Sequence, residues 1–190
     1  MSWLPAEVTS APASEPLSVA DATEQVKADA SDATDQAYIL ALTKAARAHV
    51  ESWTGLKLVT QTVRLRRRDF EADMLLPIAP VQSISSVKYL DTAGAEQTLA
   101  TTVWDAVLYG KEPRVYLAHQ QTWPSLYTSP EAVTITAVVG FTTLPEEIGH
   151  ALKLLVSSWY DQRAGTSEKM IAETPHAVAA LLSNWRLFAF

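Results

Sequence analysis

Four histidines and the absence of cysteine limit the chemistry that the side chains of this 190-residue chain can perform. Without a thiol, the sequence offers no disulfide, thiolate metal site or catalytic cysteine, and no metalloprotease, serine-hydrolase, phosphate-loop or dinucleotide-binding motif occurs. Glu146 and His150 stand four residues apart on an expected helix, but two ligands rarely suffice to hold a metal ion. The sequence therefore predicts no catalytic, cofactor-binding or metal-binding residues.

A small-ligand or enzymatic pocket is the main alternative class of function. Such a pocket would lie between a β unit and the long helices, with polar groups that converge in a concavity. The candidate groups are Asp105, Tyr109, Glu112 and His119, whose spacing is that of ordinary loop residues. We therefore treat this class as the alternative to a non-enzymatic function.

The charge of the chain is acidic overall, with one basic cluster. A net charge of −6 argues against a broad basic face that grips nucleic acid. Arg64, Arg66 and Arg68 share one face of an expected strand, and acidic residues follow at once from Asp69. The cluster reads as a solvated strand face, as a partner for an acidic surface of a neighbouring subunit, or as a DNA contact. These three arginines are our candidates for contacts between subunits.

Several aromatic residues stand where an interface would use them. Trp123 lies in an expected loop and is a further candidate for contacts between subunits. Trp185, Leu187, Phe188 and Phe190 crowd the C-terminus, which favours docking on a partner, with packing against the same subunit as the alternative. No apolar run is long enough for a membrane span, and none resembles a secretion signal.

The pattern of apolar residues predicts an α+β fold. It is a helical bundle, with two long helices and short N- and C-terminal helices, into which a small antiparallel β unit is inserted. Residues 1–16 are rich in proline and small residues and are expected to form a flexible arm. The expected elements are helices at about 18–28, 34–54 and 145–164, a β insertion at about 58–140 and a final helix and tail at 175–190, which leaves 17–174 as the main domain.

Local signals set several finer expectations. Ser18 is the expected N-cap of the first helix, Asp32 or Thr34 caps the second, and Gly55 ends it. Ile84 has the wrong parity for its strand, which predicts a β-bulge near Ser85. The expected buried stripe of the second helix consists of Tyr38, Ile39, Leu42, Ala45, Ala46, His49, Val50 and Trp53.

The order of these segments resembles a known family. The segments are ILALTKAARAHVESWTG, VQSISSVKYLDTAGAEQTL, TWPS, AVTITAVVGF, LPEEIGHALKLLVSSWYDQR and TPHAVAALLSNWR. Together they resemble the head-to-tail connector proteins (adaptor or head-completion proteins) of long-tailed phages and of phage-derived gene transfer agents. The resemblance covers residues 17–186 and rests on the order of these segments along the chain.

The resemblance implies a structural protein without cofactors, located at the neck of a phage or gene-transfer-agent particle assembled in the bacterial cytoplasm. It implies a homo-oligomeric ring, expected to be dodecameric, between the portal protein and a stopper or tail-terminator protein, with DNA passing through without sequence-specific binding. The segment 175–190 would dock on the portal through Trp185, Arg186, Leu187, Phe188 and Phe190. Another neck component, such as a stopper or tail terminator, is the alternative within the same particle.

Overall fold

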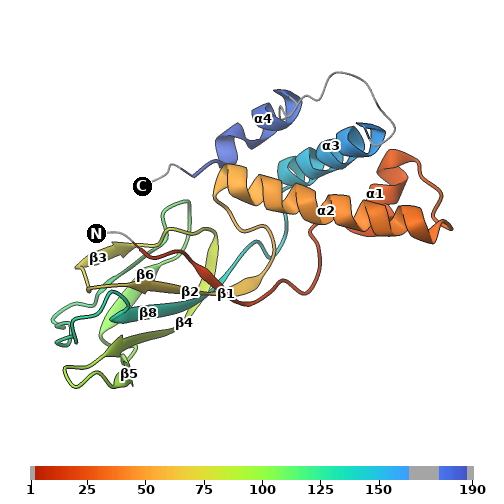
Figure 1. Ribbon diagram of the computed structural model, residues 1–190. Coiled ribbons are helices and arrows are strands. Elements are labelled where there is room, and N and C mark those ends of the chain that lie inside the picture. The colour runs from red at the N-terminus through yellow and green to blue at the C-terminus, as the bar shows by residue number, and fades with distance from the viewer. Residues whose placement is uncertain (1–2, 163–175, 188–190) are drawn as a thin grey trace. The chain divides into compact units, whose positions relative to one another are not determined.

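The computed structural model of the chain describes residues 3–162 and 176–187, and over them the fold is mixed α+β (Figure 1). The helices are α1 (Val19–Val26), α2 (Ala33–Thr54), α3 (Glu146–Gln162) and α4 (His176–Leu182), followed by the 3₁₀ turn η1 (Ser183–Trp185). The strands are β1 (Glu7–Ser10), β2 (Gln61–Arg67), β3 (Asp73–Leu75), β4 (Val81–Leu90), β5 (Glu96–Thr98), β6 (Trp104–Val107), β7 (Arg114–Leu117) and β8 (Val133–Val139).

The described residues form two compact units. The sheet unit consists of Val59–Phe141 together with the chain up to Ala13, and the helical unit consists of Ser14–Leu58 together with the chain from Thr142 onward. The predicted α+β class is therefore confirmed. The β part, however, is two sheets that make a unit of their own, rather than a small insertion in a bundle of two long helices.

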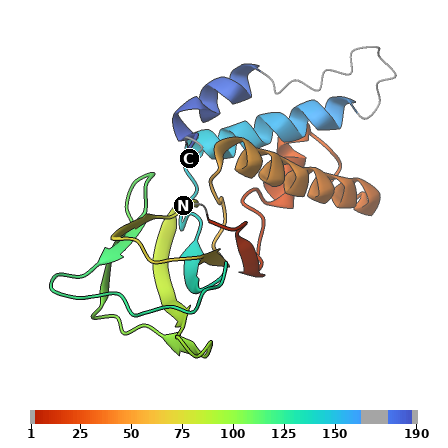
Figure 2. The same cartoon turned by 60° about the vertical axis from the view of Figure 1, so that its left-hand side comes forward.

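The sheet unit is built from two antiparallel sheets (Figure 2). One has five strands in the order β1-β2-β8-β4-β5, and the other has three in the order β3-β7-β6. β2 and β8 bury alternate residues, as their sequence pattern predicts, because successive strand side chains point to opposite faces. The predicted bulge is confirmed, since the pairing of β4 with β8 shifts between Ile84 and Ser86.

A single apolar cluster joins the two sheets into one core. Its fully buried members include Val63 and Leu65 of β2, Ile135 of β8, Met74 of β3 and Val115 of β7. Burial of such side chains stabilises a fold by about 1.5–3 kcal/mol each before the entropy of ordering is counted. This core holds the outer face of the five-stranded sheet in a fixed shape.

Residues 3–10 differ from the expected flexible arm. Glu7–Ser10 form β1, which pairs with β2 at the edge of the sheet. Trp3 anchors the segment, because its indole N–H donates to the carbonyl of Leu75 at 2.7 Å and the Arg67 guanidinium lies 4.9 Å from the ring centre. Composition alone predicts disorder here, but backbone pairing and one large aromatic anchor give the segment a fixed place.

The helical unit packs α3 against the other three helices. The Ser18 hydroxyl accepts from the Asp21 N–H at 3.0 Å and caps α1, as predicted, and Asp32 rather than Thr34 caps α2. Gly55 ends α2 at φ 76°, the left-handed conformation expected of a glycine in this place. The expected end of the third helix near residue 164 and the expected start of the final helix at residue 175 lie outside the described residues.

The buried face of α2 is rotated from the predicted stripe. The helix buries Ile39, Thr43, Ala46, Val50, Glu51 and Thr54. Trp53, which we expected in the core, is 38% exposed, and Glu51, which we placed outside the stripe, is only 8% exposed. The prediction for this helix is wrong at its C-terminal end, because polar contacts rather than hydrophobicity decide which side chains are buried there.

We expect Gly140→Ala to destabilise the sheet unit strongly. Gly140 has a φ of 106°, and a Cβ added to it would lie 2.2 Å from the carbonyl oxygen of Val59. The strained conformation and the backbone clash together should lower the free energy of unfolding by about 3 kcal/mol or more. Urea denaturation followed by circular dichroism measures the effect.

Gly110→Ala is the matched control for this substitution. Gly110 also has a positive φ, 84°, but a Cβ there meets no atom within 4 Å among the described residues. Gly110→Ala should therefore lower the free energy of unfolding only by the backbone strain, about 1–2 kcal/mol. Equal losses for the two variants would show that the close approach of Val59 to Gly140 does not matter for stability.

Candidate interaction surfaces

The outer face of the five-stranded sheet carries a polar hollow of about 370 Å³. Arg64 and Arg66 reach it from β2, Lys88 from β4, and Thr134 and Thr136 from β8. The remaining lining residues are Tyr89, Leu90, Glu96, Ser129, Glu131 and Ala132. The structure thus brings two of the three predicted arginines together and adds a lysine that the sequence pattern did not single out.

Each of these cations pairs with an acid of the same sheet unit. Arg66 lies 2.5 Å from Glu7 and Arg64 lies 3.4 Å from the same carboxylate oxygen. Lys88 lies 2.6 Å from Glu96. Such half-exposed pairs contribute about 0–1 kcal/mol each, so a charged partner can replace them at little cost. We call this set of residues around the hollow the sheet face.

Arg68 does not line the hollow. It is 61% exposed and lies 3.7 Å from Asp69. Its neighbour Arg67 is only 3% exposed, on the opposite side of β2, 2.6 Å from Glu71. Burial is the largest single effect on the Glu71 carboxyl and raises its pKa, but the opposing effects, among them the charge and the hydrogen bond of Arg67, together bring this pKa below its ordinary value. The basic cluster therefore splits between the outer face and the interior.

Trp123, the predicted interface tryptophan, contacts its own sheet unit. Its ring stacks on Phe70 with centroids 4.4 Å apart, and its indole N–H donates to the Glu71 carbonyl at 3.1 Å. The side chain is partly buried and borders the core cluster. Its role in contacts between subunits stays a prediction.

The C-terminal segment up to Leu187 folds back on the helices of its own unit. The Trp185 indole N–H donates to Glu147 at 2.8 Å, and the Arg186 guanidinium lies 5.3 Å from the ring centre of Trp53. The Leu187 N–H donates to the Thr54 carbonyl at 2.7 Å. The other two candidates for portal docking, Phe188 and Phe190, lie outside the described residues.

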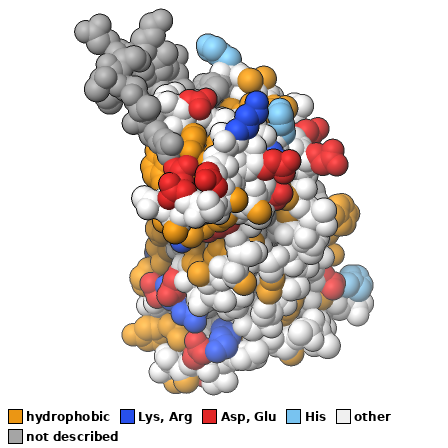
Figure 3. Space-filling view, turned by 90° about the vertical axis from the view of Figure 1, so that its right-hand side faces the viewer, with side chains coloured by type: hydrophobic (Ala, Val, Ile, Leu, Met, Phe, Trp, Pro, Cys, Tyr) orange, Lys and Arg blue, Asp and Glu red, His pale blue; other side chains and the backbone are white. Residues whose placement is uncertain are grey.

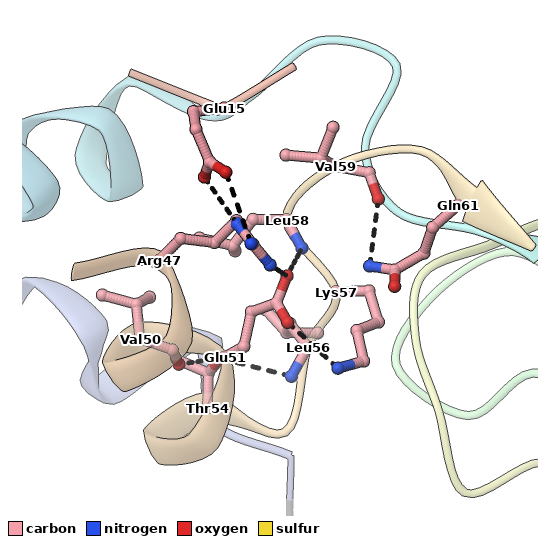
Figure 4. A network of polar contacts seen from close by, with 10 residues as sticks. All are labelled: Glu15, Arg47, Val50, Glu51, Thr54, Leu56, Lys57, Leu58, Val59 and Gln61. Atoms are coloured by element: carbon pink, nitrogen blue, oxygen red, sulfur yellow. Dashed lines mark hydrogen bonds and ion pairs between the residues drawn. The ribbon is translucent and has the colours of Figure 1, made fainter. Parts of the chain in front are cut away.

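The C-terminal end of α2 is a junction of polar contacts, drawn in Figure 4. The Glu51 carboxylate accepts from the Leu58 N–H and from the Lys57 ammonium, both at 3.0 Å. The Thr54 hydroxyl donates to the Val50 carbonyl at 2.7 Å and accepts from the Leu56 N–H at 3.2 Å. We call this end of α2, with the segments it holds, the α2 corner.

Arg47 extends the α2 corner toward the N-terminal part of the helical unit. Its guanidinium donates to Glu15 at 2.7 Å and lies 3.8 Å from Glu51 (Figure 4). The hydrogen bond to Glu15 raises the pKa of Arg47, and the charges of both carboxylates add to it against the effect of burial. Sequence reasoning missed this junction, because its partners are up to 32 positions apart in the chain.

Acidic side chains gather on the part of the helical unit seen in Figure 3. α1 and the start of α2 carry Asp21, Glu24, Asp29, Asp32 and Asp35, with Lys27 the one base between residues 19 and 43. Beside them, a shallow hollow of about 480 Å³ is lined mainly by α1 and the segment that follows it. These five acids therefore give the helical unit one acidic region.

The residues considered for chemistry lie outside the linings of both hollows described above. Within residues 3–162 and 176–187, no group of three or more His, Asp and Glu side chains is placed to hold a metal ion. Asp105, Tyr109, Glu112 and His119 line neither of the two hollows, and Tyr109 is 83% exposed. His49 lies edge-on to Trp159 at 5.9 Å. No helix in the described part of the chain is long and apolar enough to cross a membrane.

Three solved structures have the same fold over almost the whole chain. A chain in the neck of an empty gene transfer agent (GTA) particle, computed with C6 symmetry, matches at a TM-score of 0.80 and 24% identity. Chains in a native GTA virion and in a native GTA neck computed with C12 symmetry match at TM-scores of 0.78 and 0.75, each with 26% identity. Each match covers 98% of this chain and 97% of the other.

The sequence itself also matches a family model. No curated protein matches the chain. The model described as "Head completion protein" matches residues 17–180, which span both the sheet unit and the helical unit. Since this match covers far more than half of the 190 residues, the chain belongs to the head completion protein family.

Proposed function

We propose that the chain forms a ring at the neck of a phage-type particle and joins the DNA-filled head to the tail. Membership of the head completion family makes it a structural protein of the neck, and the fold of GTA neck proteins supports the same location. A structural role, without catalysis, fits this family. The match over residues 17–180 is the observation that carries the proposal.

The proposed ring is a dodecamer of this chain. One similar chain belongs to a native GTA neck computed with C12 symmetry, which supports twelve copies. A closed ring of identical copies needs two different surfaces that fit each other. The sheet face with Arg64 and Arg66, the neighbouring Arg68, and Trp123 are our candidates for one of them. The acidic region of α1 and α2 has the opposite charge to the arginines of the sheet face, so it is our candidate for the second surface.

The segment 175–190 is the proposed contact with the portal protein, and 17–174 is the proposed connector domain. Trp185, Arg186 and Leu187 are held on the helices, which gives the segment a defined starting point at the α2 corner. Three residues follow Leu187, and two of them are phenylalanines. The stopper or tail-terminator protein would then bind the opposite end of the ring.

In this proposal, DNA passes through the ring without sequence-specific binding. The chain carries a net charge of −6, and like charge keeps phosphates from adhering to the wall of a channel. This argues for passage of DNA rather than sequence-specific binding.

Deletion of the gene in the cell that makes the particle tests the proposed function. We expect heads that contain DNA and separate tails to accumulate, with joined particles restored by a plasmid copy. Electron microscopy of the lysate counts the DNA-containing heads, the separate tails and the joined particles. Normal numbers of joined particles in the deletion strain would overturn the proposal.

A further inference from the structure

Three segments that are distant in sequence meet at the α2 corner. Glu15 follows the link at residues 13–14, where the chain passes from the sheet unit to the helical unit. Lys57 and Leu58 precede the link at residues 58–59, where the chain passes back. Arg186 and Leu187 belong to the C-terminal segment. The last two turns of one helix therefore hold two links between the units and the segment proposed for docking.

Glu51 is the centre of this arrangement. Its carboxylate is only 8% exposed and accepts from the Leu58 N–H and the Lys57 ammonium, while Arg47 lies 3.8 Å away. Through Arg47 the network reaches Glu15 (Figure 4). The Glu51 carbonyl also accepts from the Gly55 N–H at 2.9 Å, and the carbonyl of the neighbouring Thr54 accepts from the Leu187 N–H at 2.7 Å.

The position of Glu51 is unfavourable for helix formation alone. It lies near the C-terminal end of α2, where the helix dipole is negative and repels a carboxylate. Burial adds a desolvation cost, which is offset only when a buried charge has good partners. Glu51 has them: Lys57 and the Leu58 N–H lie in the segment that follows the helix, and Arg47 lies one turn earlier on the helix. Its two hydrogen bonds therefore hold the segment after the helix rather than the helix itself.

We propose that Glu51 is a positioning residue for assembly: it fixes the path of both links and supports the seat of the C-terminal segment. The part of this proposal that concerns assembly rests on the proposed function. The links enter the helical unit in a defined direction because one carboxylate holds the second link directly and the first through Arg47. A ring that presents one surface to the head and another to the tail needs links with a fixed path. A flexible link would let the positions of these contact surfaces vary from copy to copy.

Amide hydrogen exchange in the full-length protein tests the positioning role directly. Glu51→Ala removes the acceptor of the Leu58 N–H, and exchange at Leu58 should rise by about 10- to 100-fold, the value of a hydrogen bond to a charged group. Glu51→Gln keeps an acceptor oxygen but loses the charge that attracts Lys57 and Arg47, so its effect should be smaller. Glu146→Gln, the same change at an exposed acid on α3, is the matched control and should not change exchange at Leu58.

The same variants are then tested for joining heads to tails in the deletion strain. Glu51→Ala should lower the yield of joined particles at least tenfold, Glu51→Gln should lower it less, and Glu146→Gln should match the wild type. If Glu51→Ala fails to fold, Glu51→Gln must still raise exchange at Leu58 and lower the yield. Unchanged exchange at Leu58, or raised exchange with a normal yield, overturns the positioning role. A deletion strain that joins particles normally overturns the proposed function instead.

Discussion

A chain that ends at Leu187 is expected to fold normally and to lose attachment to the head. The deletion removes Phe188, Ala189 and Phe190 and leaves the contacts of Trp185, Arg186 and Leu187 with the helices in place. Aromatic anchors at an interface commonly account for 2 kcal/mol or more each, so binding should weaken by at least about 30-fold. Co-sedimentation of the purified chain with tail-less heads measures the loss.

Two controls separate lost anchoring from lost folding. The double variant Phe188→Leu and Phe190→Leu keeps apolar bulk and should bind more tightly than the truncated chain. Thermal unfolding of the truncated chain should match that of the full chain, because no described contact is removed. Wild-type binding to heads by the truncated chain would show that the tail does not dock.

Reversing the charge of Arg64, Arg66 and Arg68 to Glu is expected to abolish ring formation in low salt. If these arginines face an acidic surface of the next copy, three attractive contacts become repulsive. The loss of rings should be greater at about 0.1 M salt than at about 1 M salt, because the Debye length falls from about 10 Å to about 3 Å and the repulsion is then screened. Native mass spectrometry of the assembled neck measures the ring population at both concentrations.

The triple variant also breaks a contact within the subunit, because Arg64 and Arg66 both pair with Glu7 of β1. Arg68→Glu alone avoids that contact and should give a smaller defect with the same salt dependence. A second chain with Lys44, Lys111 and Lys153 reversed has the same net charge and serves as the control. Rings that form equally in all variants and at both salt concentrations would contradict the proposed interface.

The elements that local signals define were predictable from the sequence. The cap at Ser18, the stop at Gly55 and the bulge before Ser86 each depend on residues within a few positions of one another. β8 was predictable because Val133 and Ile135 alternate with threonines and face a buried layer. Such signals locate helices and strands, and the order of the segments indicated the family.

The sequence could not reveal features that depend on distant partners. β1 looked like a flexible arm, because its place depends on pairing with β2, 57 positions away at Glu7 and Arg64. Glu51 looked like an exposed helix residue, because the donors that justify its burial lie beyond the helix end. Apolar periodicity likewise placed Trp53 in the core, although it is partly exposed beneath Arg186.

Electron microscopy of particles that carry an epitope-tagged copy of the chain in their producing cell tests whether the chain forms a ring between head and tail. A ring in this place predicts antibody label at the neck of joined particles, and a dodecamer predicts twelvefold symmetry in averaged images of that region. Label on the capsid shell or the tail tip, or particles without any label, would contradict the proposed ring.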